Sequence, residues 1–524
     1  MALTRRQQAV VLAGITFAVF FPTLSAGFVY DARMQILTGE FIHQWRHWPA
    51  VLTGRVLGMD VLDFNRPAML ASLMLDAAVW GRDPFGYHLT SVLLHVVNVL
   101  LVWRLIDVVA PPGVGAGPAA RLWPLLATLV FAVHPLVAEA VCEPTYREDL
   151  LVAACTLAAL VLALRHDPQT AAADGLRALA CAACCLLAVA SKEAGVAAPL
   201  LLASAWWLLR GGEPGRFWAL AIGGGMLAAV GFLAARFLLE PATSSIFITR
   251  PVPLGGSPAR ALLLGARILA LYAQLVVAPV NLCADYGLAS IRHLPLWLAA
   301  AILLLLAAAA MVAARYDRRM LFACLMIVLP LVPVANIVPI YRPAADRYLY
   351  LSLAGVAVAF ARLLDAPWVA RRPDRRRRLA VGGIGVVAAL GLCCIGRQQV
   401  WMSELALWDD TLRKNPFSET AALGLGEALR GAGRLPEAER ATRQAIRLSQ
   451  GRRGDAYATL ALILDARGRR QDAAEAVAVA LRIEPRLADP DACVAALAMD
   501  RPTADALERL LAETRPAGWP PARK

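Results

Sequence analysis

The sequence predicts an all-α chain, with a multi-pass helical membrane domain over residues 1–398 and a helical-repeat tail over residues 399–524. Hydrophobic residues make up 59% of the 524 residues, against about 45–50% in an ordinary soluble domain, and the excess lies in long blocks before residue 395. In the tail, small residues and glycines recur at a fixed spacing. This composition excludes a secreted disulfide scaffold, a disordered chain and a purely soluble enzyme.

The apolar blocks are expected to form membrane helices, because only helices and closed barrels satisfy their backbone hydrogen bonds in lipid. Several are shorter than the about 20 residues that span a bilayer, so their ends are set only approximately. The first block lacks a small-residue cleavage site and is expected to remain as an anchor. The blocks lie at 9–28, 88–109, 122–141, 150–164, 178–191, 195–209, 217–239, 261–280, 294–314, 320–338, 349–364 and 379–395.

Arginines predict the orientation of these helices. The formal net charge is +13, but the arginines crowd short loops between apolar blocks, so they indicate membrane flanks and no nucleic-acid partner. If the amino terminus is cytoplasmic and 261–280 does not cross, these loops all lie inside, which predicts about eleven crossings and an outer tail. Block 261–280 is then interfacial or re-entrant. The loops contain Arg165 and Arg177, Arg210 and Arg216, Arg315, Arg318 and Arg319, and the cluster 371–378.

The high alanine and arginine content favours a bacterial protein of the inner membrane, with its tail in the periplasm. The first outer loop, about residues 29–87, is long enough to indicate a function, and its tryptophans favour short amphipathic helices on the membrane surface. It contains His43, Trp45, His47, Trp48, Asp60, Asp63, Arg66 and Asp76. Most cysteines lie in apolar helices, and a bridge between Cys142 and Cys283 stays open.

The tail carries a repeat. The segment from Leu425 through Gly433 to Ala445 matches the segment from Leu460 through Gly468 to Ala480, and the two glycines are 35 residues apart (468 minus 433). This spacing is close to the about 34 residues of a tetratricopeptide repeat, in which small residues let two antiparallel helices pack closely. Two interpretations remain open, a surface that docks a protein or peptide and a structural cap.

Ionisable residues gather at the outer ends of the predicted membrane helices, where they are costly unless used. Their shared side predicts one outward cavity for a substrate with a phosphate head and a lipid tail. Lysine and arginine would hold the phosphate, and a carboxylate could act as a base. The clusters are Tyr30-Asp31; Asn65-Arg66-Pro67; His88, His95 and Asn98; His134, Glu139 and Arg147; Ser191-Lys192-Glu193; and Asn336, Pro339, Asp346, Arg347 and Tyr348.

Each residue also has a structural interpretation. His88 and His95 stand two helical turns apart, about 10 Å, which is too far to share one metal ion. Packing or a hydrogen bond to Asn98 is expected for His95. Glu143 and Arg147 stand at i,i+4 and could simply pair. Lys192-Glu193 could be a loop charge pair, and Arg66-Pro67 a turn.

In combination these motifs resemble the transmembrane-and-tetratricopeptide-repeat family of protein O-mannosyltransferases and their bacterial relatives, which are C-type (GT-C) glycosyltransferases. The matching stretches follow the family order over nearly the whole chain. They are FVYDARMQI (28–36), NRPAMLASL (65–73), FGYHLTSVLLHVVN (85–98), LVFAVHPLVAEAV (129–141), SKEAGV (191–196), NIVPI (336–340) and DRYLYL (346–351), followed by the repeats.

The resemblance implies a polyprenyl-phosphate sugar donor, a protein or other periplasmic acceptor, and an acidic catalytic residue in the first outer loop. Asp31 matches the first of the family's paired aspartates and is the expected general base. Ala32 replaces the second aspartate, so the resemblance leaves the binding of a divalent metal open. Family positions are also matched at Glu139 and Glu193, and Glu139 is a second catalytic candidate. They are further matched at Arg147, Lys192 and Arg347. These three residues, together with Arg66, are the candidate phosphate ligands. Tyr30, His88, His134 and Tyr348 are expected to line the pocket.

Two alternatives are kept. The chain could be an inactive membrane scaffold whose repeats dock envelope proteins, as the loss of the second aspartate at Ala32 allows. It could also flip lipid-linked sugars, but the charged groups gather at one side instead of forming a path through the midplane.

Overall fold

The computed structural model describes residues 4–59, 61–111, 122–167, 170–212, 215–239, 254–292, 294–336, 340, 342–365, 373–489, 493 and 501–514. Every regular element in these ranges is a helix, which confirms the predicted all-α class. Asp60, Pro339 and the first two arginines of the 371–378 cluster lie outside them. The chain divides into two compact units, which are described separately.

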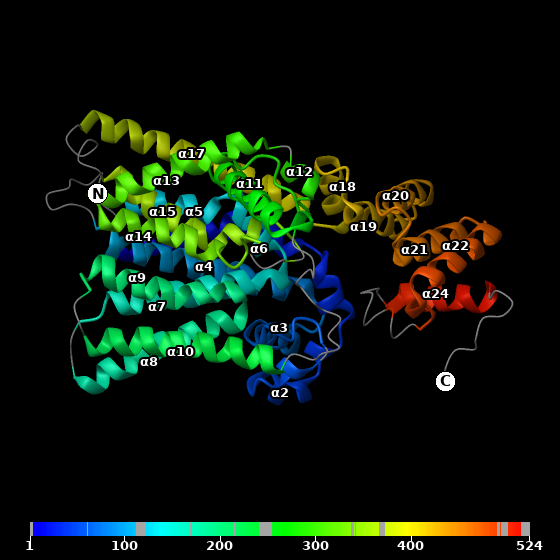
Figure 1. The fold of residues 1–524 in the computed structure, drawn as a ribbon, viewed down its shortest axis with the longest axis horizontal. Coiled ribbons are helices and arrows are strands. Elements are labelled where there is room, and N and C mark those ends of the chain that lie inside the picture. Colours follow the sequence, from blue (N-terminus) through cyan, green and yellow to red (C-terminus); the bar gives the residue numbers. More distant parts are fainter. Residues whose placement is uncertain are drawn as a thin grey trace. The chain divides into compact units, whose positions relative to one another are not determined.

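The first unit comprises residues 1–26, 41–282 and 291–399. Long helices lie side by side along most of its length (Figure 1). They are α1 (Arg5–Phe20), α4 (Pro84–Val109), α5 (Leu122–Val133), α6 (Ala138–Cys142), α7 (Arg147–Leu164), α8 (Ala171–Ser191), α9 (Ala197–Leu209), α10 (Arg216–Leu239), α11 (Pro258–Val277), α13 (Leu296–Tyr316), α14 (Arg318–Val328), α15 (Tyr350–Leu364) and α17 (Pro373–Val400), whose last residue belongs to the second unit.

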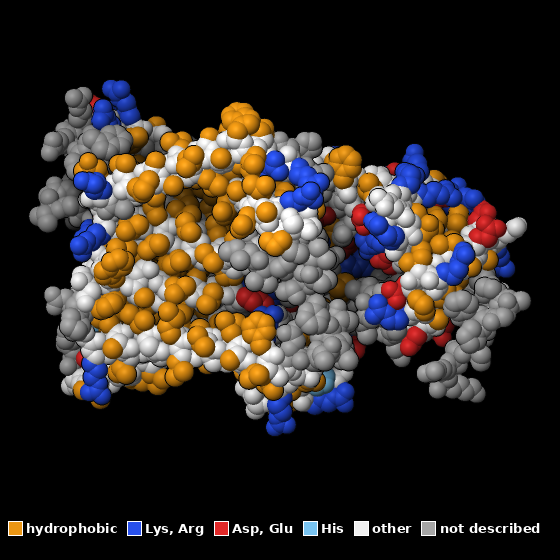
Figure 2. All heavy atoms as spheres, viewed as in Figure 1, with side chains coloured by type: hydrophobic (Ala, Val, Ile, Leu, Met, Phe, Trp, Pro, Cys, Tyr) orange, Lys and Arg blue, Asp and Glu red, His pale blue; other side chains and the backbone are white. Residues whose placement is uncertain are grey.

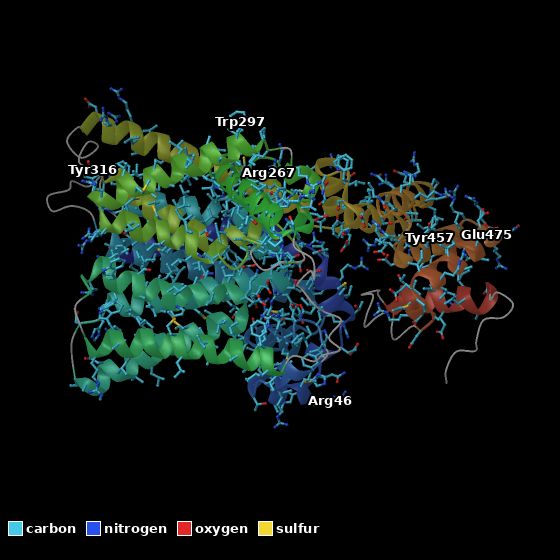
Figure 3. The ribbon with its side chains drawn as sticks, in the orientation of Figure 1. Arg46, Arg267, Trp297, Tyr316, Tyr457 and Glu475 are labelled. Carbon is cyan, nitrogen blue, oxygen red and sulfur yellow. The ribbon has the colours of Figure 1, made fainter. Side chains whose placement is uncertain are left out.

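Seven helices of the described part are long and apolar enough to cross a membrane, or eight if the bent pair of α5 and α6 is one span. Hydrophobic side chains cover the middle of this unit (Figure 2). Trp297 of α13 projects outward and is 72% exposed (Figure 3), as expected for a side chain that faces lipid. The chain is therefore a multi-pass membrane protein. The number of about eleven crossings and the interfacial position of 261–280 stay predictions.

The apolar blocks and the helices differ where prolines lie. The block 320–338 was expected to be one helix, but α14 ends at Val328, because Pro330 and Pro333 cannot continue its hydrogen bonds. Likewise, α1 ends at Phe20, two residues before Pro22. The block 122–141 bends by 46° between α5 and the helices that follow it, at His134-Pro135.

Two of the arginine-rich loops lie close together and near the start of α1. Arg5, beside the amino terminus, and Arg165 both contact Asp107, at 2.9 and 3.4 Å. Arg177 donates to the carbonyl of Arg165, and Arg210 donates to the carbonyl of Leu164. This gathering fits the positive-inside prediction, whereas the orientation itself stays a prediction.

Short helices occupy the first loop, as expected. They are η3 (Phe41–His43), η4 (Trp45–His47), α2 (Trp48–Leu52), η5 (Arg55–Gly58) and the longer α3 (Pro67–Trp80). Arg66 directly precedes α3, whose first residue is a proline, a residue preferred at that position.

The second unit comprises residues 27–40, 283–290 and 400–524. Its helices include α18 (Glu404–Lys414), α19 (Glu419–Gly431), α20 (Leu435–Leu448), α21 (Gly454–Ala466), α22 (Arg470–Ile483) and α24 (Arg501–Thr514). Gly433 and Gly468 adopt left-handed φ of 73° and 75° and turn the chain within the α19–α20 and α21–α22 pairs. These paired helices are compatible with the predicted repeat.

Two segments from much earlier in the chain pack on this tail, and the predicted boundary at 398/399 does not anticipate them. The side-chain hydroxyl of Ser418 donates to the Asp285 carboxylate at 2.5 Å, and Asn415 donates to the Asp285 carbonyl at 2.9 Å. Residues 27–40 form the second segment, and they contain Asp31 and the π-helix η2 (Arg33–Thr38).

Candidate functional site

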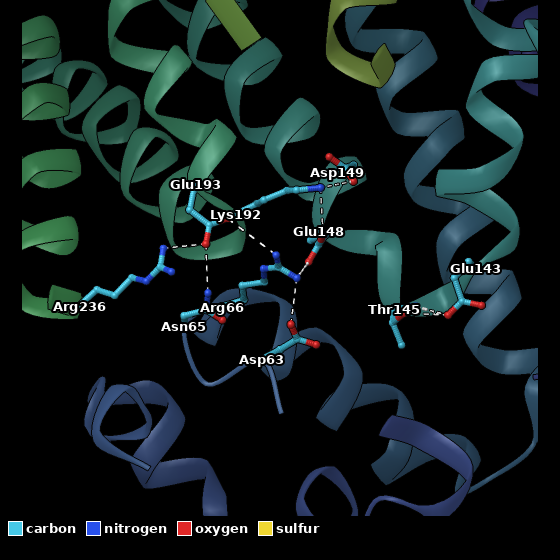
Figure 4. A network of polar contacts seen from close by, with 10 residues as sticks. All are labelled: Asp63, Asn65, Arg66, Glu143, Thr145, Glu148, Asp149, Lys192, Glu193 and Arg236. Carbon is cyan, nitrogen blue, oxygen red and sulfur yellow. Dashed lines mark hydrogen bonds and ion pairs between the residues drawn. The ribbon is translucent and has the colours of Figure 1, made fainter. Parts of the chain in front are cut away.

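Charged residues of the first unit form one connected network around Arg66 (Figure 4). The guanidinium of Arg66 lies 2.9 Å from Asp63 and 2.5 Å from Glu148, a residue of the first turn of α7. Burial lowers the pKa of Arg66, but the charges of Glu148 and Asp63 outweigh burial and raise the pKa above its usual range. Arg66 is therefore the positively charged residue through which the first loop contacts the start of α7.

Lys192 and Glu193 extend this network in two directions. Lys192 lies 2.6 Å from Asp149 and 3.0 Å from Glu148. Glu193 lies 2.6 Å from Arg236, in the last turn of α10, and accepts a hydrogen bond from Asn65 at 3.0 Å. Lys192 has an extended backbone (φ −167°, ψ 154°), which turns neighbouring side chains to opposite faces. The two residues thus pair elsewhere, not with each other.

The pKa of Glu193 reflects these contacts. Burial alone would raise it, but the guanidiniums of Arg66 and Arg236 lower the pKa to about 2. Taken together, the network holds one more carboxylate than cations, so it has no spare positive charge of its own. The carboxylates are Asp63, Glu148, Asp149 and Glu193, and the cations are Arg66, Lys192 and Arg236.

A second ion pair joins Glu139 of α6 to Arg347 of η12 (Asp346–Leu349). Glu139 is 1% exposed and accepts both from the Arg347 guanidinium and, at 3.0 Å, from the Arg347 backbone N–H. The guanidinium carbon of Arg347 lies 3.8 Å from the centre of the Tyr146 ring. Two hydrogen bonds and an aromatic face therefore fix Arg347 in one position.

Tyr348 connects the two sets of charges. Its ring centre lies 5.0 Å from the Lys192 nitrogen and 5.1 Å from the Arg347 guanidinium carbon. Its hydroxyl donates to the Arg342 carbonyl at 3.3 Å. Burial and the nearby charge of Arg347 lower the pKa of Arg342 to about 10. Arg342 and Arg347 are both largely buried.

Arg147 does not pair with Glu143, the i,i+4 partner considered from the sequence. It is fully buried and lies 2.6 Å from Asp76 of α3. It also donates to the Ser72 hydroxyl at 3.0 Å and to the Tyr87 carbonyl at 2.8 Å. Glu143 instead accepts from the Thr145 hydroxyl at 2.7 Å and caps the turn that follows it. Three acceptors around Arg147 favour a structural role.

The histidines are also held by structural contacts. His95 Nδ1 lies 2.6 Å from the Tyr350 hydroxyl, and the Asn98 amide donates to the same hydroxyl at 3.1 Å. His95 and Asn98 are thus joined through Tyr350, and His95 is fully buried against Phe20 and Tyr350, in agreement with the packing alternative. His134 caps the bend after α5, with Nε2 3.1 Å from the Val276 carbonyl. His88 is fully buried in α4.

A small cavity lies between the two sets of charges, lined by Asp149, Lys192 and Tyr348 among others. Its volume of about 10 Å³ accommodates at most one water molecule, so a sugar would need the lining side chains to move. Within the described residues, no group of three or more His, Cys, Asp or Glu side chains is placed to hold a metal ion. The cysteines there are all free thiols, including Cys142 and Cys283.

Asp31, the expected general base, belongs to the second unit. It follows Tyr30, which has a left-handed φ of 54°, and it precedes the π-helix η2. Both features are concentrated at functional sites. Ala32 is fully buried and directly precedes η2, so no carboxylate stands in that position. The meeting of Asp31 with Glu139, Lys192 and Arg347 stays a prediction.

Several members of the network were not singled out from the sequence. Arg236 resembles an ordinary membrane-flanking arginine, and Arg342 lies in a loop. The pair Glu148-Asp149 did carry a signal, because two carboxylates beside Arg147 at the start of an apolar helix are costly unless paired.

No family model matches the chain. Among curated proteins, it is 28% identical to protein O-mannosyl-transferase Tmtc2 of Drosophila melanogaster over 300 residues, which cover 54% of this chain and 31% of the relative. It is 23% identical to protein O-mannosyl-transferase F38B6.6 of Caenorhabditis elegans over 453 residues, covering 84% and 62%.

The chain is similar to Tmtc protein O-mannosyl-transferases. A third relative, Tmtc1 of Drosophila melanogaster, is 33% identical over 159 residues, 29% of this chain and 18% of the relative. The chain thus spans between about a fifth and three fifths of the length of these three relatives.

Among solved structures, the chain is similar to ArnT from Cupriavidus metallidurans bound to undecaprenyl phosphate. The TM-score is 0.46 and the sequence identity 15%, with 97% of this chain and 85% of that chain covered. The apo form of the same protein gives a TM-score of 0.44 at 17% identity, with coverages of 95% and 84%.

Proposed function

We propose that this chain is a membrane glycosyltransferase that transfers a sugar, such as mannose, from a polyprenyl-phosphate donor to a hydroxyl of a protein acceptor. The observation that carries the proposal is the similarity to protein O-mannosyl-transferases over most of the chain, combined with a set of buried cations and carboxylates in the membrane unit.

The donor phosphate is proposed to bind at Arg342 and Arg347, with Lys192 on the other side of Tyr348. Burial and the nearby charge of Arg347 together lower the pKa of Arg342. An anionic phosphate close to both guanidiniums would be attracted to each of them. Arg66, Lys192 and Arg347 each already contact a carboxylate, so they would help to position the donor as well as attract it.

In the proposed reaction, Asp31 takes the proton of the acceptor hydroxyl while the hydroxyl oxygen attacks the anomeric carbon. A new carbon–oxygen bond forms there, and the bond from that carbon to the phosphate oxygen breaks. Polyprenyl phosphate leaves with the electron pair, and its growing charge is stabilised by Arg342, Arg347 and Lys192. Glu139 fixes the Arg347 guanidinium in place.

The test is transfer of labelled mannose from mannosyl-phosphoryl-polyprenol to a serine- and threonine-containing peptide in proteoliposomes. We expect Asp31→Asn to lower the transfer rate by about 10²–10⁴-fold, the usual contribution of a general base, while donor binding persists. Full activity of Asp31→Asn would overturn the assignment of the base.

A second candidate function is an inactive membrane scaffold, and it is favoured by one observation, the buried Ala32 where the family has its second aspartate. The same assay separates the two functions. A scaffold neither binds the donor nor transfers its sugar, whereas the proposed enzyme does both.

A further inference from the structure

The backbone just before Asp31 is held in an uncommon conformation. Tyr30 has a φ of 54°, which places a bulky side chain in the left-handed region. Such a conformation is unfavourable and persists only where its surroundings fix it. The structure therefore must supply contacts that hold Tyr30.

These contacts come from the first helix of the tail. The Tyr30 backbone N–H donates to the Glu404 carboxylate at 2.5 Å, and the second oxygen of that carboxylate accepts from the indole N–H of Trp408. The Trp408 and Tyr30 rings meet edge to face, with centroids 5.1 Å apart at 73°. The Tyr30 N–H thus joins the strained loop to α18, and Trp408 of the same helix holds the other oxygen of the Glu404 carboxylate.

Trp408 is in turn fixed by the repeat helices. A Cβ at Gly424 of α19 would lie 2.5 Å from the indole, so only glycine lets the ring lie against this helix. A separate backbone bond, from Gly27 N–H to the Met402 carbonyl at 3.4 Å, holds the start of the same loop. The loop around Tyr30, α18 and α19 therefore pack together as one substructure.

We infer that Glu404 is a positioning residue for the transfer reaction: by fixing Tyr30 it directs Asp31, and the repeat tail is a working part of the active site as well as a possible docking surface. The inference rests on the proposed function, because it takes Asp31 to be the base. Glu404 acts through the Tyr30 backbone and is not itself expected to contact the substrate.

The experiment uses the full chain in proteoliposomes with labelled mannosyl-phosphoryl-polyprenol and the peptide acceptor. It compares Glu404→Ala with Glu404→Gln, which keeps one carbonyl acceptor, and with Trp408→Phe, which keeps a ring but loses the N–H. Glu437→Gln is the matched control, because Glu437 is a carboxylate of the same tail that is exposed and paired with Arg434. The readouts are kcat, the KM for the donor, and hydrogen exchange of the Tyr30 amide.

A hydrogen bond to a charged acceptor contributes about 1.5–3 kcal/mol, which corresponds to roughly a ten- to hundredfold change. We expect Glu404→Ala to lower kcat and to speed exchange of the Tyr30 amide by about that factor, with KM unchanged. Glu404→Gln should give a smaller loss of kcat, Trp408→Phe a smaller one still, and Glu437→Gln none. If Glu404→Ala fails to fold, Glu404→Gln and Trp408→Phe carry the same comparison.

Unchanged exchange at Tyr30, or faster exchange with unchanged kcat, would overturn the inference while leaving the proposed function intact. A fall in kcat accompanied by an equal loss of donor affinity would also overturn it, because that result indicates general damage to the site. Activity in Asp31→Asn would instead overturn the assignment of the base. The two failures are therefore distinguishable.

Discussion

Glu139 and Arg347 are 208 residues apart in the sequence, yet the Glu139 carboxylate accepts from both the backbone and the guanidinium of Arg347. The carboxylate comes from the bent helix pair and the guanidinium from the turn before α15. This contact fixes two elements of the membrane unit at the place where we propose that the donor phosphate binds.

Glu139→Ala is expected to destabilise the protein by about 3–5 kcal/mol, because it leaves a buried guanidinium without its carboxylate. Thermal unfolding in detergent micelles would measure the change, with the exposed Glu437→Gln as the control. Equal melting temperatures for the two variants would contradict a buried, energetically coupled pair.

Arg147→Lys is expected to lower stability by about 1–3 kcal/mol, since an ammonium cannot reach Asp76, Ser72 and the Tyr87 carbonyl together. The KM for the donor should stay unchanged if Arg147 is structural. A large increase in that KM with unchanged stability would instead indicate that Arg147 binds the donor phosphate.

Arg342→Gln is expected to raise the KM for the donor by roughly ten- to hundredfold, the loss of one charge-assisted hydrogen bond to phosphate. Donor titration in nanodiscs measures this KM. A wild-type KM would exclude Arg342 from the phosphate site.

The stability of the protein should depend on pH through Glu193. Its pKa is lowered from 4.5 to about 2 by Arg66 and Arg236 against the opposing effect of burial. A carboxyl with a lowered folded pKa stabilises the fold fully above its unfolded pKa, and this contribution is lost as the pH falls from 4.5 toward 2. Thermal unfolding at several pH values should show this loss, and Glu193→Gln should reduce it.

The sequence predicted the positions of helices better than it predicted which charged residues pair. Apolar blocks gave α4 and α10 within a few residues, because burial in lipid leaves few alternatives to a helix. Pro330 and Pro333 lie inside a block that remains apolar on average, so the predicted helix extended beyond the end of α14.

Ion-pair partners were less predictable, since they depend on which elements pack together. Arg147 has Glu143 at helical spacing but pairs with Asp76 of another helix. The charges at Lys192 and Glu193 are adjacent in sequence, but an extended backbone turns them toward different partners. Sequence spacing identifies neighbours along one helix and says little about contacts between helices.

The bond between Tyr30 and Glu404 has a consequence for biosynthesis. The amide and its acceptor are 374 residues apart, so the acceptor leaves the ribosome roughly 20–75 seconds after the amide, at about 5–20 residues per second. During that interval residues 27–40 lack their final partner, while the intervening helices insert into the bilayer. A stretch that is synthesised before most of the described helices is thus among the last to gain its final contacts.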